Sequence, residues 1–217
     1  MAEQQLSELI PRFDLRGMDL QLERMRHALQ DLGSPCGEIP AIQVAGTNGK
    51  GSIASFLSAA LQQAGIRSGV TTSPHLVSWC ERIAIDGVPI SEGDLRQLLL
   101  AQQQLCAKHQ LTPFEQLLAA ALAHFHTEAV ELLVLEVGLG GRLDATTAHP
   151  RRPVIAMASI GLDHCEHLGS TLTAIAEEKA AVITPGAQVI SAEQPAPVRE
   201  VLEKTCSANN AVLRWVD

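Results

Sequence analysis

A glycine-rich turn carries one lysine and one serine, a combination suited to binding phosphate. The turn ends the segment Ala41-Ile-Gln-Val-Ala-Gly-Thr-Asn-Gly-Lys-Gly-Ser52, whose first half is β-branched and apolar. A helix is expected to follow over 53–64. Backbone N–H groups of such a loop and the positive end of the helix dipole favour anions, and Lys50 can reach the terminal phosphates of a nucleotide. Ser52 is placed for a Mg²⁺ ion that accompanies the nucleotide.

The spacing of this turn departs from the common P-loop, Gly-x-x-x-x-Gly-Lys-Ser/Thr. Gly46 stands three residues before Gly49, and Gly51 is inserted before Ser52. An ordinary glycine-rich turn is the alternative interpretation. A phosphate-binding loop is favoured because strand, glycines, lysine and helix coincide.

Glu136 places a carboxylate in an otherwise apolar strand expected over 132–137. Burying a carboxylate costs several kcal/mol unless it is paired or binds a cation. Two interpretations are open. The glutamate either ends the strand with hydrogen bonds to nearby backbone, or it serves as a Mg²⁺ ligand at the same sheet edge as the phosphate loop.

Asp163-His-Cys-Glu-His167 gathers several potential ligands in one short loop. A zinc site is disfavoured because no second cluster lies at suitable spacing. A polar surface loop is one alternative, and one histidine joining a magnesium or phosphate site near Glu136 is the preferred one. Lys179, by composition alone, is typical of a solvated helix lysine. The stretch 138–146 resembles a dinucleotide fingerprint but fails where Leu143 replaces its third glycine.

These residues must be positioned by strands that alternate with helices. Strands are expected at 41–45, 68–72, 132–137, 153–159, 188–191 and 211–216, with helices at 19–32, 53–64, 91–108, from 112, at 171–183 and at 196–207. Ser91 is expected to cap a helix, with Asp94 in the capping-box position, and Thr112 with Glu115 is expected to form a capping box. The fold class predicted is α/β, a doubly wound, mostly parallel, P-loop NTPase-like sheet with helices on both faces. A small β-hairpin annex over 83–90 turns at Asp86-Gly87.

Composition limits the possible partners. The chain has 217 residues, is 46% hydrophobic and 18% charged, and carries a net charge of −8. No basic run suits a nucleic-acid backbone, and no apolar run suits a membrane span or a leader. The five scattered cysteines lack a Cys-x-x-Cys pair, which favours reduced thiols in a cytoplasmic protein.

Taken together, these motifs resemble the folylpolyglutamate synthase and dihydrofolate synthase family within the Mur ligase superfamily. The matching segments are Val44 to Ser52, Thr72 to Leu76, Glu81 to Ile83, Phe114-Glu115, Leu135 to Thr146, Leu162 to His164 and Glu178-Lys179. The resemblance implies an ATP-dependent, ADP-forming carboxylate–amine ligase that is a monomer. It would add L-glutamate to dihydropteroate or folate through an acyl phosphate, with ATP and one or two Mg²⁺ ions.

The resemblance also implies roles for individual residues. Lys50, His164 and Lys179 would be catalytic, Lys179 as a lysine that the family carbamylates. The nucleotide would be bound by Asn48, Gly49, Lys50, Gly51 and Ser52, and metal by Ser52, Ser73, Glu136 and His164. The pterin region would comprise Thr112, Phe114, Glu115, Leu143, Asp144 and Ala145, with Arg12 to Asp14 as further contributors. Pro113 and Thr147 depart from the family pattern, Thr147 standing in place of Asn.

Members of this family are longer and have a carboxy-terminal domain that closes over the glutamate site. Residues 1–217 are therefore expected to form one ATP-binding domain without the carboxy-terminal ligase domain. Such a domain alone is expected to be largely inactive. Two alternatives are a non-catalytic nucleotide- or pterin-binding module, and a Mur-type ligase acting on cell-wall precursors. The second alternative is disfavoured by the segments 73–75 and 135–146.

Overall fold

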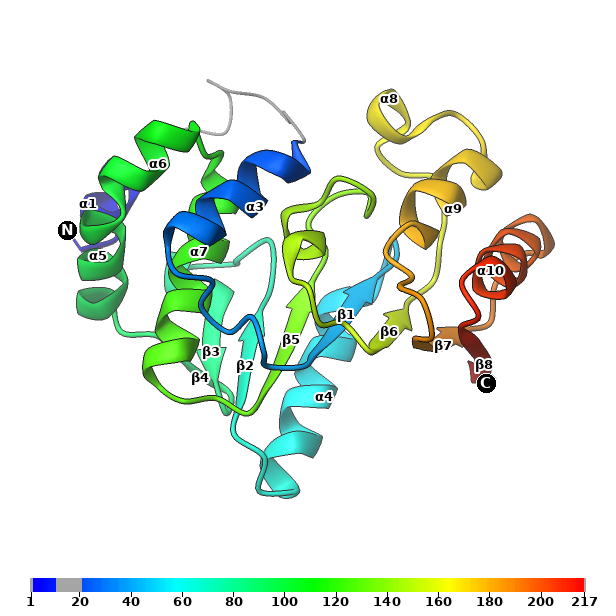
Figure 1. Cartoon of the computed structure of the whole chain (residues 1–217), viewed down its shortest axis with the longest axis horizontal. Coiled ribbons are helices and arrows are strands. Elements are labelled where there is room, and N and C mark those ends of the chain that lie inside the picture. Colours follow the sequence, from blue (N-terminus) through cyan, green and yellow to red (C-terminus); the bar gives the residue numbers. More distant parts are fainter. Residues whose placement is uncertain (1, 11–20, 217) are drawn as a thin grey trace.

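The computed structural model describes residues 2–10 and 21–216, and within them helices and strands alternate along the chain (Figure 1). In chain order the elements are α1 (Ala2–Leu9), α3 (Leu22–Asp31), β1 (Ala41–Ala45), α4 (Lys50–Gln63), β2 (Ser68–Thr71), η1 (Trp79–Arg82), β3 (Ile83–Ile85), β4 (Val88–Pro89), α5 (Glu92–Ala101), α6 (Gln103–His109), α7 (Pro113–Thr127), β5 (Leu132–Glu136), η2 (Ala145–Ala148), β6 (Val154–Met157), α8 (Cys165–Leu168), α9 (Leu172–Ala180), β7 (Gln188–Ala192), α10 (Ala196–Ala208) and β8 (Val212–Val216).

The strands form an eight-stranded sheet in the order β4-β3-β2-β5-β1-β6-β7-β8. The six strands from β2 to β8 in this order run parallel to one another. At the edge of the sheet, β3 pairs antiparallel with β2, and β4 pairs antiparallel with β3. The hairpin turns at Asp86 and Gly87, with φ angles of 49° and 77°, as a two-residue turn between twisted strands requires. The predicted fold class is confirmed, and the hairpin annex extends the main sheet.

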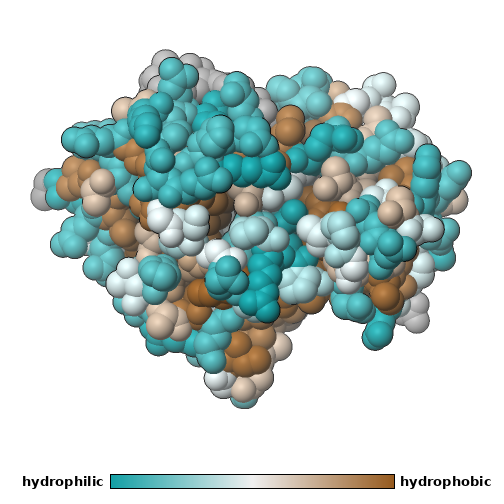
Figure 2. Space-filling view, viewed as in Figure 1, coloured by the Kyte–Doolittle hydropathy of each residue, from teal (hydrophilic) through white to brown (hydrophobic). Residues whose placement is uncertain are grey.

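Helices cover both faces of the sheet unequally. Among the described residues, α4 packs on one face against Val44, Val70 and Val134, below the sheet in Figure 1. The larger core lies on the opposite face under α3, α5 and α7, and continues under α9 and α10. Figure 2 shows mostly hydrophilic surface over α3 and α6.

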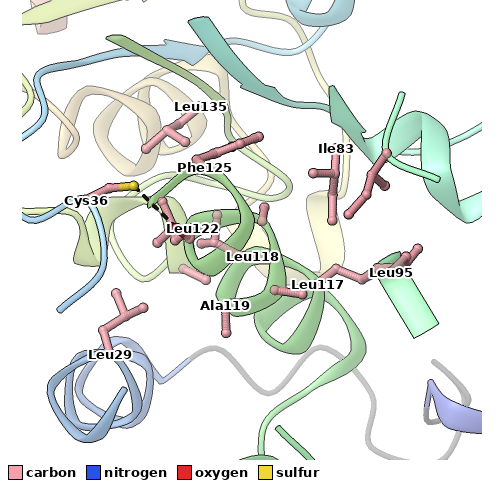
Figure 3. Packing of buried hydrophobic residues seen from close by; sticks show 14 of the residues in the cluster. Leu29, Cys36, Ile83, Leu95, Leu117, Leu118, Ala119, Leu122, Phe125 and Leu135 are labelled. Carbon is pink, nitrogen blue, oxygen red and sulfur yellow. Dashed lines mark hydrogen bonds between the residues drawn. The ribbon is translucent and has the colours of Figure 1, made fainter. Parts of the chain in front are cut away.

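Phe125 of α7 shows how closely this larger core is packed. Its ring lies beside Leu135 of β5 (Figure 3). A Cβ on Gly69 of β2 would lie 2.7 Å from the same ring, so no larger side chain fits there. The Cys36 thiol donates a hydrogen bond to the carbonyl of Leu122 over 3.3 Å. Distant segments are thereby fixed to α7, the helix whose start borders the candidate site.

Several helix boundaries differ from the sequence prediction, among them the end of the helix expected over 171–183, which is α9 (Leu172–Ala180). The helix after the glycine-rich turn begins at Lys50, three residues earlier than expected, so the lysine belongs to its first turn. The helix expected over 91–108 is divided into α5 and α6 at Gln102, whose φ and ψ are −97° and 3°. Gln102 is buried, and its side-chain amide reaches the Ala119 carbonyl of α7, a contact between elements that periodicity does not reveal. Within the described residues no helix has the length and apolar character needed to cross a membrane.

Candidate active site at the carboxyl ends of the strands

Four loops that follow parallel strands meet around one cleft, as expected for the carboxyl edge of an open α/β sheet. The cleft has a volume of about 430 Å³ and joins the glycine-rich turn after β1 with the loops after β2, β5 and β6, and the start of α7 forms a further part of its wall. Its lining residues are Thr47, Lys50, Ser73, Pro74, Arg82, Thr112, Pro113, Phe114, Glu115, Gly138, Leu139, Leu143, Asp144, Ala145, Asp163 and His164. Residues predicted from separate motifs therefore share one cavity.

The glycine-rich turn is fixed against the end of β6. Thr47 N–H donates to the Ser159 carbonyl over 2.8 Å, and the Thr47 hydroxyl accepts from Gly161 N–H over 3.1 Å. Gly46 has a φ of +137°, and a Cβ at this position would lie 2.7 Å from Cβ of Ala158. Only glycine therefore allows this close approach of turn and strand.

The other end of the turn is open. Gly49 has a φ of +90°, and no atom lies within 4 Å of the position that a Cβ would occupy. Lys50 begins α4, and its Nζ donates to the Thr47 carbonyl over 3.1 Å, which holds the ammonium group within the turn. Asn48 and Ser52 are exposed beside it. Free space, a helix N-terminus and a held cation fit a phosphate group.

Glu136 ends β5 and is only 4% exposed. Its Oε2 accepts from Ser73 N–H over 3.0 Å, so the backbone hydrogen bond of the first interpretation is present. A Cβ on Gly51 would lie 3.8 Å and 3.9 Å from the two carboxylate oxygens, which places Glu136 beside the start of α4. Burial raises the pKa of Glu136, against the Ser73 hydrogen bond and the charges of Lys50 and Arg82. A carboxylate with this cost of burial suits a cation, and that role stays a prediction.

His164 lines the cleft together with Asp163, in the loop after β6. The His164 backbone has a φ of 47° and precedes the one-turn helix α8. Its ring nitrogens lie 3.6 Å from a carboxylate oxygen of Asp163 and 3.9 Å from one of Glu166. Among the described residues, no group of three or more His, Cys, Asp or Glu side chains that could hold a metal ion is found.

Lys179 of α9 is buried, with 4% of its surface exposed, so the interpretation as a solvated lysine is wrong. Its Nζ donates to the Gly46 carbonyl over 3.0 Å, directly behind the glycine-rich turn. Burial, followed by the charge of Lys50, lowers the pKa of Lys179 to about 8. The sheltered position that a carbamylated lysine needs is therefore present, while carbamylation itself stays a prediction.

The start of α7 forms one wall of the cleft. Thr112 and Glu115 make the predicted capping box in both directions, with Pro113 in the first turn. The Glu115 carboxylate also pairs with Arg24 of α3 at 3.0 Å. Phe114 packs on the loop after β5, since a Cβ on Gly138 would lie 2.9 Å from its ring. Glu115 thus positions this wall, and Phe114 supplies its aromatic surface.

Asp144 organises the loop after β5 and is 1% exposed. Its carboxylate accepts hydrogen bonds from the N–H groups of Gly138 at 2.9 Å and Leu139 at 3.0 Å. A further bond of 2.9 Å comes from Thr146 N–H. Leu143 remains 42% exposed at the cleft, and Ala145 is buried behind it. In this loop, Asp144 therefore fixes the backbone that presents Leu139 and Leu143.

Several residues that build the site were not singled out from the sequence. Gln43 of β1 is fully buried and donates to the hydroxyls of Thr146 and Thr147, each at 2.9 Å. A polar residue inside an apolar strand indicates a buried polar contact, and the sequence shows this pattern at Gln43 as it does at Glu136. The departure at Thr147 is explained in part, because its hydroxyl also donates to the Gly141 carbonyl over 2.8 Å.

Arg82 is a second residue that sequence reasoning left without a role. It lines the cleft, is 8% exposed and donates from Nε to His75 Nδ1 over 2.8 Å. Its charge opposes the rise in the pKa of Glu136. The segment Arg12 to Asp14, expected to contribute to the pterin region, lies outside the described residues.

Comparison with known proteins agrees with this geometry. The dihydrofolate synthetase of Saccharomyces cerevisiae is 37% identical over 206 residues, which cover 92% of this chain and 48% of that protein. Folylpolyglutamate synthase of Mycobacterium tuberculosis, complexed with ADP and AMPPCP, matches with a TM-score of 0.86 and 36% identity, over 99% of this chain and 50% of that one. E. coli FolC in complex with DHPP and ADP matches with a TM-score of 0.88 and 32% identity, over 99% and 51%.

The chain thus spans about half the length of these relatives. The resemblance inferred from the sequence motifs is confirmed at the level of the family. A model of the Mur ligase middle domain matches residues 44–211, from the end of β1 to the residue before β8. That match covers most of the chain, so the protein belongs to the Mur ligase family and contains its middle domain.

Proposed function

We propose that this chain supplies the nucleotide- and pteroate-binding part of an ATP-dependent carboxylate–amine ligase. The observation that carries the proposal is the composition of one cleft, whose lining combines Thr47 and Lys50 of the glycine-rich turn with the apolar side chains of Phe114, Leu139 and Leu143. An aromatic acid can place its rings on the apolar side and its carboxylate toward the phosphate loop. The names of the relatives support dihydropteroate or folate as that acid and L-glutamate as the amine.

The proposed reaction has two displacements. A carboxylate oxygen of the acid bonds to the γ-phosphorus of ATP, and ADP leaves with the electrons of the broken bond. The amine nitrogen of glutamate then bonds to the carbonyl carbon of this acyl phosphate, phosphate leaves, and the nitrogen loses a proton. Positioning and charge neutralisation dominate phosphoryl transfer, so the chain acts through the amides of the turn and through Lys50.

Magnesium fits the donors beside the phosphate loop. Glu136 is a buried carboxylate that lies beside the start of α4. The hydrogen bond between described residues that reaches this carboxylate, from Ser73 N–H, is accepted by Oε2 and leaves Oε1 available. We propose that Ser52, Ser73 and Glu136 hold one ion and that His164 serves a second. Bound Mg²⁺ would neutralise phosphate charge and polarise the transferred group.

Lys179 is proposed to be carbamylated. Its neutral amine nitrogen would bond to the carbon of CO₂ and lose a proton, leaving an anionic carbamate. A pKa of about 8 leaves far more neutral amine near neutral pH than an ordinary lysine has. The resulting anion would lie behind the turn that carries Lys50, where it would hold the lysine and cations in place.

Residues 1–217 are proposed to act as one ATP-binding domain of a cytoplasmic, monomeric ligase. The greater length of the relatives supports a further domain that contacts glutamate and closes the cleft. Closure matters because water competes with the amine for an activated acid.

Titration calorimetry of ATP·Mg²⁺ into this chain, with and without dihydropteroate, tests the proposal. Lys50→Ala should abolish saturable binding, whereas Lys204→Ala, which alters an exposed lysine of α10, should leave it unchanged. Dihydropteroate should strengthen nucleotide binding, since both ligands occupy one cleft. Binding that survives Lys50→Ala, or a folded chain that binds neither ligand, would contradict the proposal.

A further inference from the structure

A second cavity lies apart from the cleft, between the carboxy-terminal half of α3, the loop over 33–37 and the segment 147–152. Its volume is about 350 Å³, and none of its described lining residues lines the cleft. Arg26, Arg152 and His149 contribute polar groups. Leu29, which faces α7 in Figure 3, and Pro150 contribute apolar walls.

The charge of this cavity is unusual for the protein. Two arginines line it, and no acidic residue is found among its described lining residues, although the chain has a net charge of −8. Among the described residues, Arg26 forms an ion pair with Glu23 at the surface, through a side chain that is 45% exposed. None of the ion pairs between described residues includes Arg152. A local excess of positive charge therefore remains.

Arg152 is buried, with 8% of its surface exposed, and its partners are neutral. Nε donates to the His149 carbonyl over 2.9 Å, and Nη1 donates to the Val182 carbonyl over 2.8 Å and to Gln43 Oε1. These three bonds fix the plane of the guanidinium group. Arg152 has no carboxylate in direct contact among the described residues, and the nearest charge that favours its cation is Asp144. Burying a charge without a directly paired counter-ion is costly, so an oxyanion would gain from a site whose orientation is already set.

The two guanidinium groups lie close enough to affect each other. Burial, and after it the charge of Arg26, lowers the pKa of Arg152 to about 10, against the charge of Asp144. The buried His149 donates from Nε2 to the Ile39 carbonyl over 2.8 Å, which holds its ring against the loop before β1. Repulsion between two cations that share a cavity is relieved when an anion binds between them.

We propose that this cavity is an anion-binding site for a small metabolite with a carboxylate or phosphate group on a compact apolar body. Arg152 and Arg26 would bind the oxyanion, and Leu29 with Pro150 would contact the body. This proposal is independent of the ligase function, because it concerns a separate cavity.

A chain of hydrogen bonds connects the proposed site with the cleft. Arg152 donates to Gln43, Gln43 donates to the Thr146 hydroxyl, and that hydroxyl donates to Asp144. Asp144 in turn accepts from Gly138 and Leu139, which line the cleft. An anion on Arg152 is therefore expected to influence the loop that presents the cleft wall.

Nuclear magnetic resonance titration of the whole chain with inorganic phosphate, and separately with glutarate, tests the site. Backbone amides over 33–37 and 147–152 should shift in a saturable manner at concentrations up to about 20 mM. Amides over 46–52 report separately on phosphate bound at the glycine-rich turn. Saturation with phosphate alone would assign a phosphate ligand, and saturation with glutarate alone a carboxylate ligand.

Arg26→Gln should weaken the binding reported by these amides roughly tenfold, because one charged donor is lost. Arg67→Gln is the matched control, since Arg67 is 44% exposed and pairs with Glu128 much as Arg26 pairs with Glu23. Arg152→Lys, which keeps the charge but loses the fixed guanidinium plane, should also weaken binding if the variant folds. The proposal is overturned if neither probe moves these amides, or if Arg67→Gln weakens binding as much as Arg26→Gln.

Discussion

At the scale of single residues, Lys179 combines a high cost of burial with a position behind the glycine-rich turn. Its pKa of about 8, against an ordinary value of 10.5, means that Lys179 loses its proton at a lower pH in the folded chain than in the unfolded chain. At about pH 8, roughly half of the Lys179 amine is neutral, against well under one per cent for an ordinary lysine. The same burial that destabilises the charged lysine therefore supplies the neutral nucleophile that carbamylation needs.

Lys179→Met is expected to stabilise the chain below about pH 8. Between the folded pKa of about 8 and the unfolded value of 10.5, the unfolded state binds more protons, so the free energy of unfolding of the original chain rises with pH. Methionine carries no charge and removes this dependence. The variant should be more stable by up to about 3 kcal/mol at neutral pH, less the lost hydrogen bond to Gly46, and this advantage should shrink by about pH 10.

Urea denaturation in carbon dioxide-free buffer at both pH values measures this difference. Lys204→Met, in the exposed part of α10, is the control and should change little at either pH. A difference between Lys179→Met and the original chain that stays constant with pH would show that the proton of Lys179 is not linked to folding.

Asp144→Asn is expected to destabilise the chain by roughly 3 kcal/mol. The amide NH₂ of asparagine would face backbone N–H groups that now donate hydrogen bonds to the carboxylate. Asp163→Asn is the matched control: Asp163 also lines the cleft, but it is exposed and accepts from its neighbour His164 N–H. The free energy of unfolding of Asp163→Asn should fall by less than about 1 kcal/mol. Chemical denaturation of both variants measures the effect, and equal losses would rule out the organising role of Asp144.

At the scale of elements, the sequence predicts those features of a helix, turn or strand that depend on contacts within that element. The capping box of Thr112 and Glu115, the turn at Asp86-Gly87 and the apolar strand before Glu136 all form as expected. Parallel strands then bring their carboxyl ends together, which is why separate motifs meet in one cleft.

Contacts between distant elements could not be predicted in the same way. Gln102, at the break between α5 and α6, contacts a carbonyl of α7, and the Glu115 carboxylate is shared with Arg24 of α3, 91 positions away. The Arg152–Gln43 bond joins positions 109 apart. Periodicity and spacing describe one element at a time, so they contain no information on which polar residues pair across the core.

The glycine-rich turn allows a prediction that separates stability from binding. Gly46→Ala should cost roughly 3 kcal/mol, because its methyl would meet Ala158 at 2.7 Å in a left-handed backbone conformation. Gly49→Ala should cost only about 1 kcal/mol, since its methyl enters open space. Both variants should lose nucleotide affinity, the first by displacing the turn and the second by filling the cradle. Calorimetry with ADP and urea denaturation measure the two effects, and full affinity in Gly49→Ala would place the nucleotide elsewhere.

At the scale of the whole molecule, exposed apolar side chains follow or precede residues that line the cleft. Leu76 is 92% exposed, Val77 is 82% exposed and Leu162 is 62% exposed, beside Pro74 and Asp163 of the lining. The Leu76–Val77 loop is held by Glu81, whose carboxylate accepts from both of their N–H groups at 2.8 Å and 2.9 Å. A fixed loop that presents apolar groups beside a cleft is suited to contact with a second domain.

We therefore expect the chain alone to bind nucleotide but to release little ADP in response to glutamate. Without closure, water reaches the activated acid and the amine is not held against it. Glutamate-dependent ADP release by this chain should remain near the rate of Lys50→Ala, while the same assay on a longer relative, such as the dihydrofolate synthetase of Saccharomyces cerevisiae, should give turnover. Appending the remaining part of that relative should raise the rate. Glutamate-dependent turnover by the chain alone would show that the exposed Leu76, Val77 and Leu162 need no covering domain. If the chain joined to the remaining part of the relative still binds nucleotide without turnover, a non-catalytic binding module would be favoured.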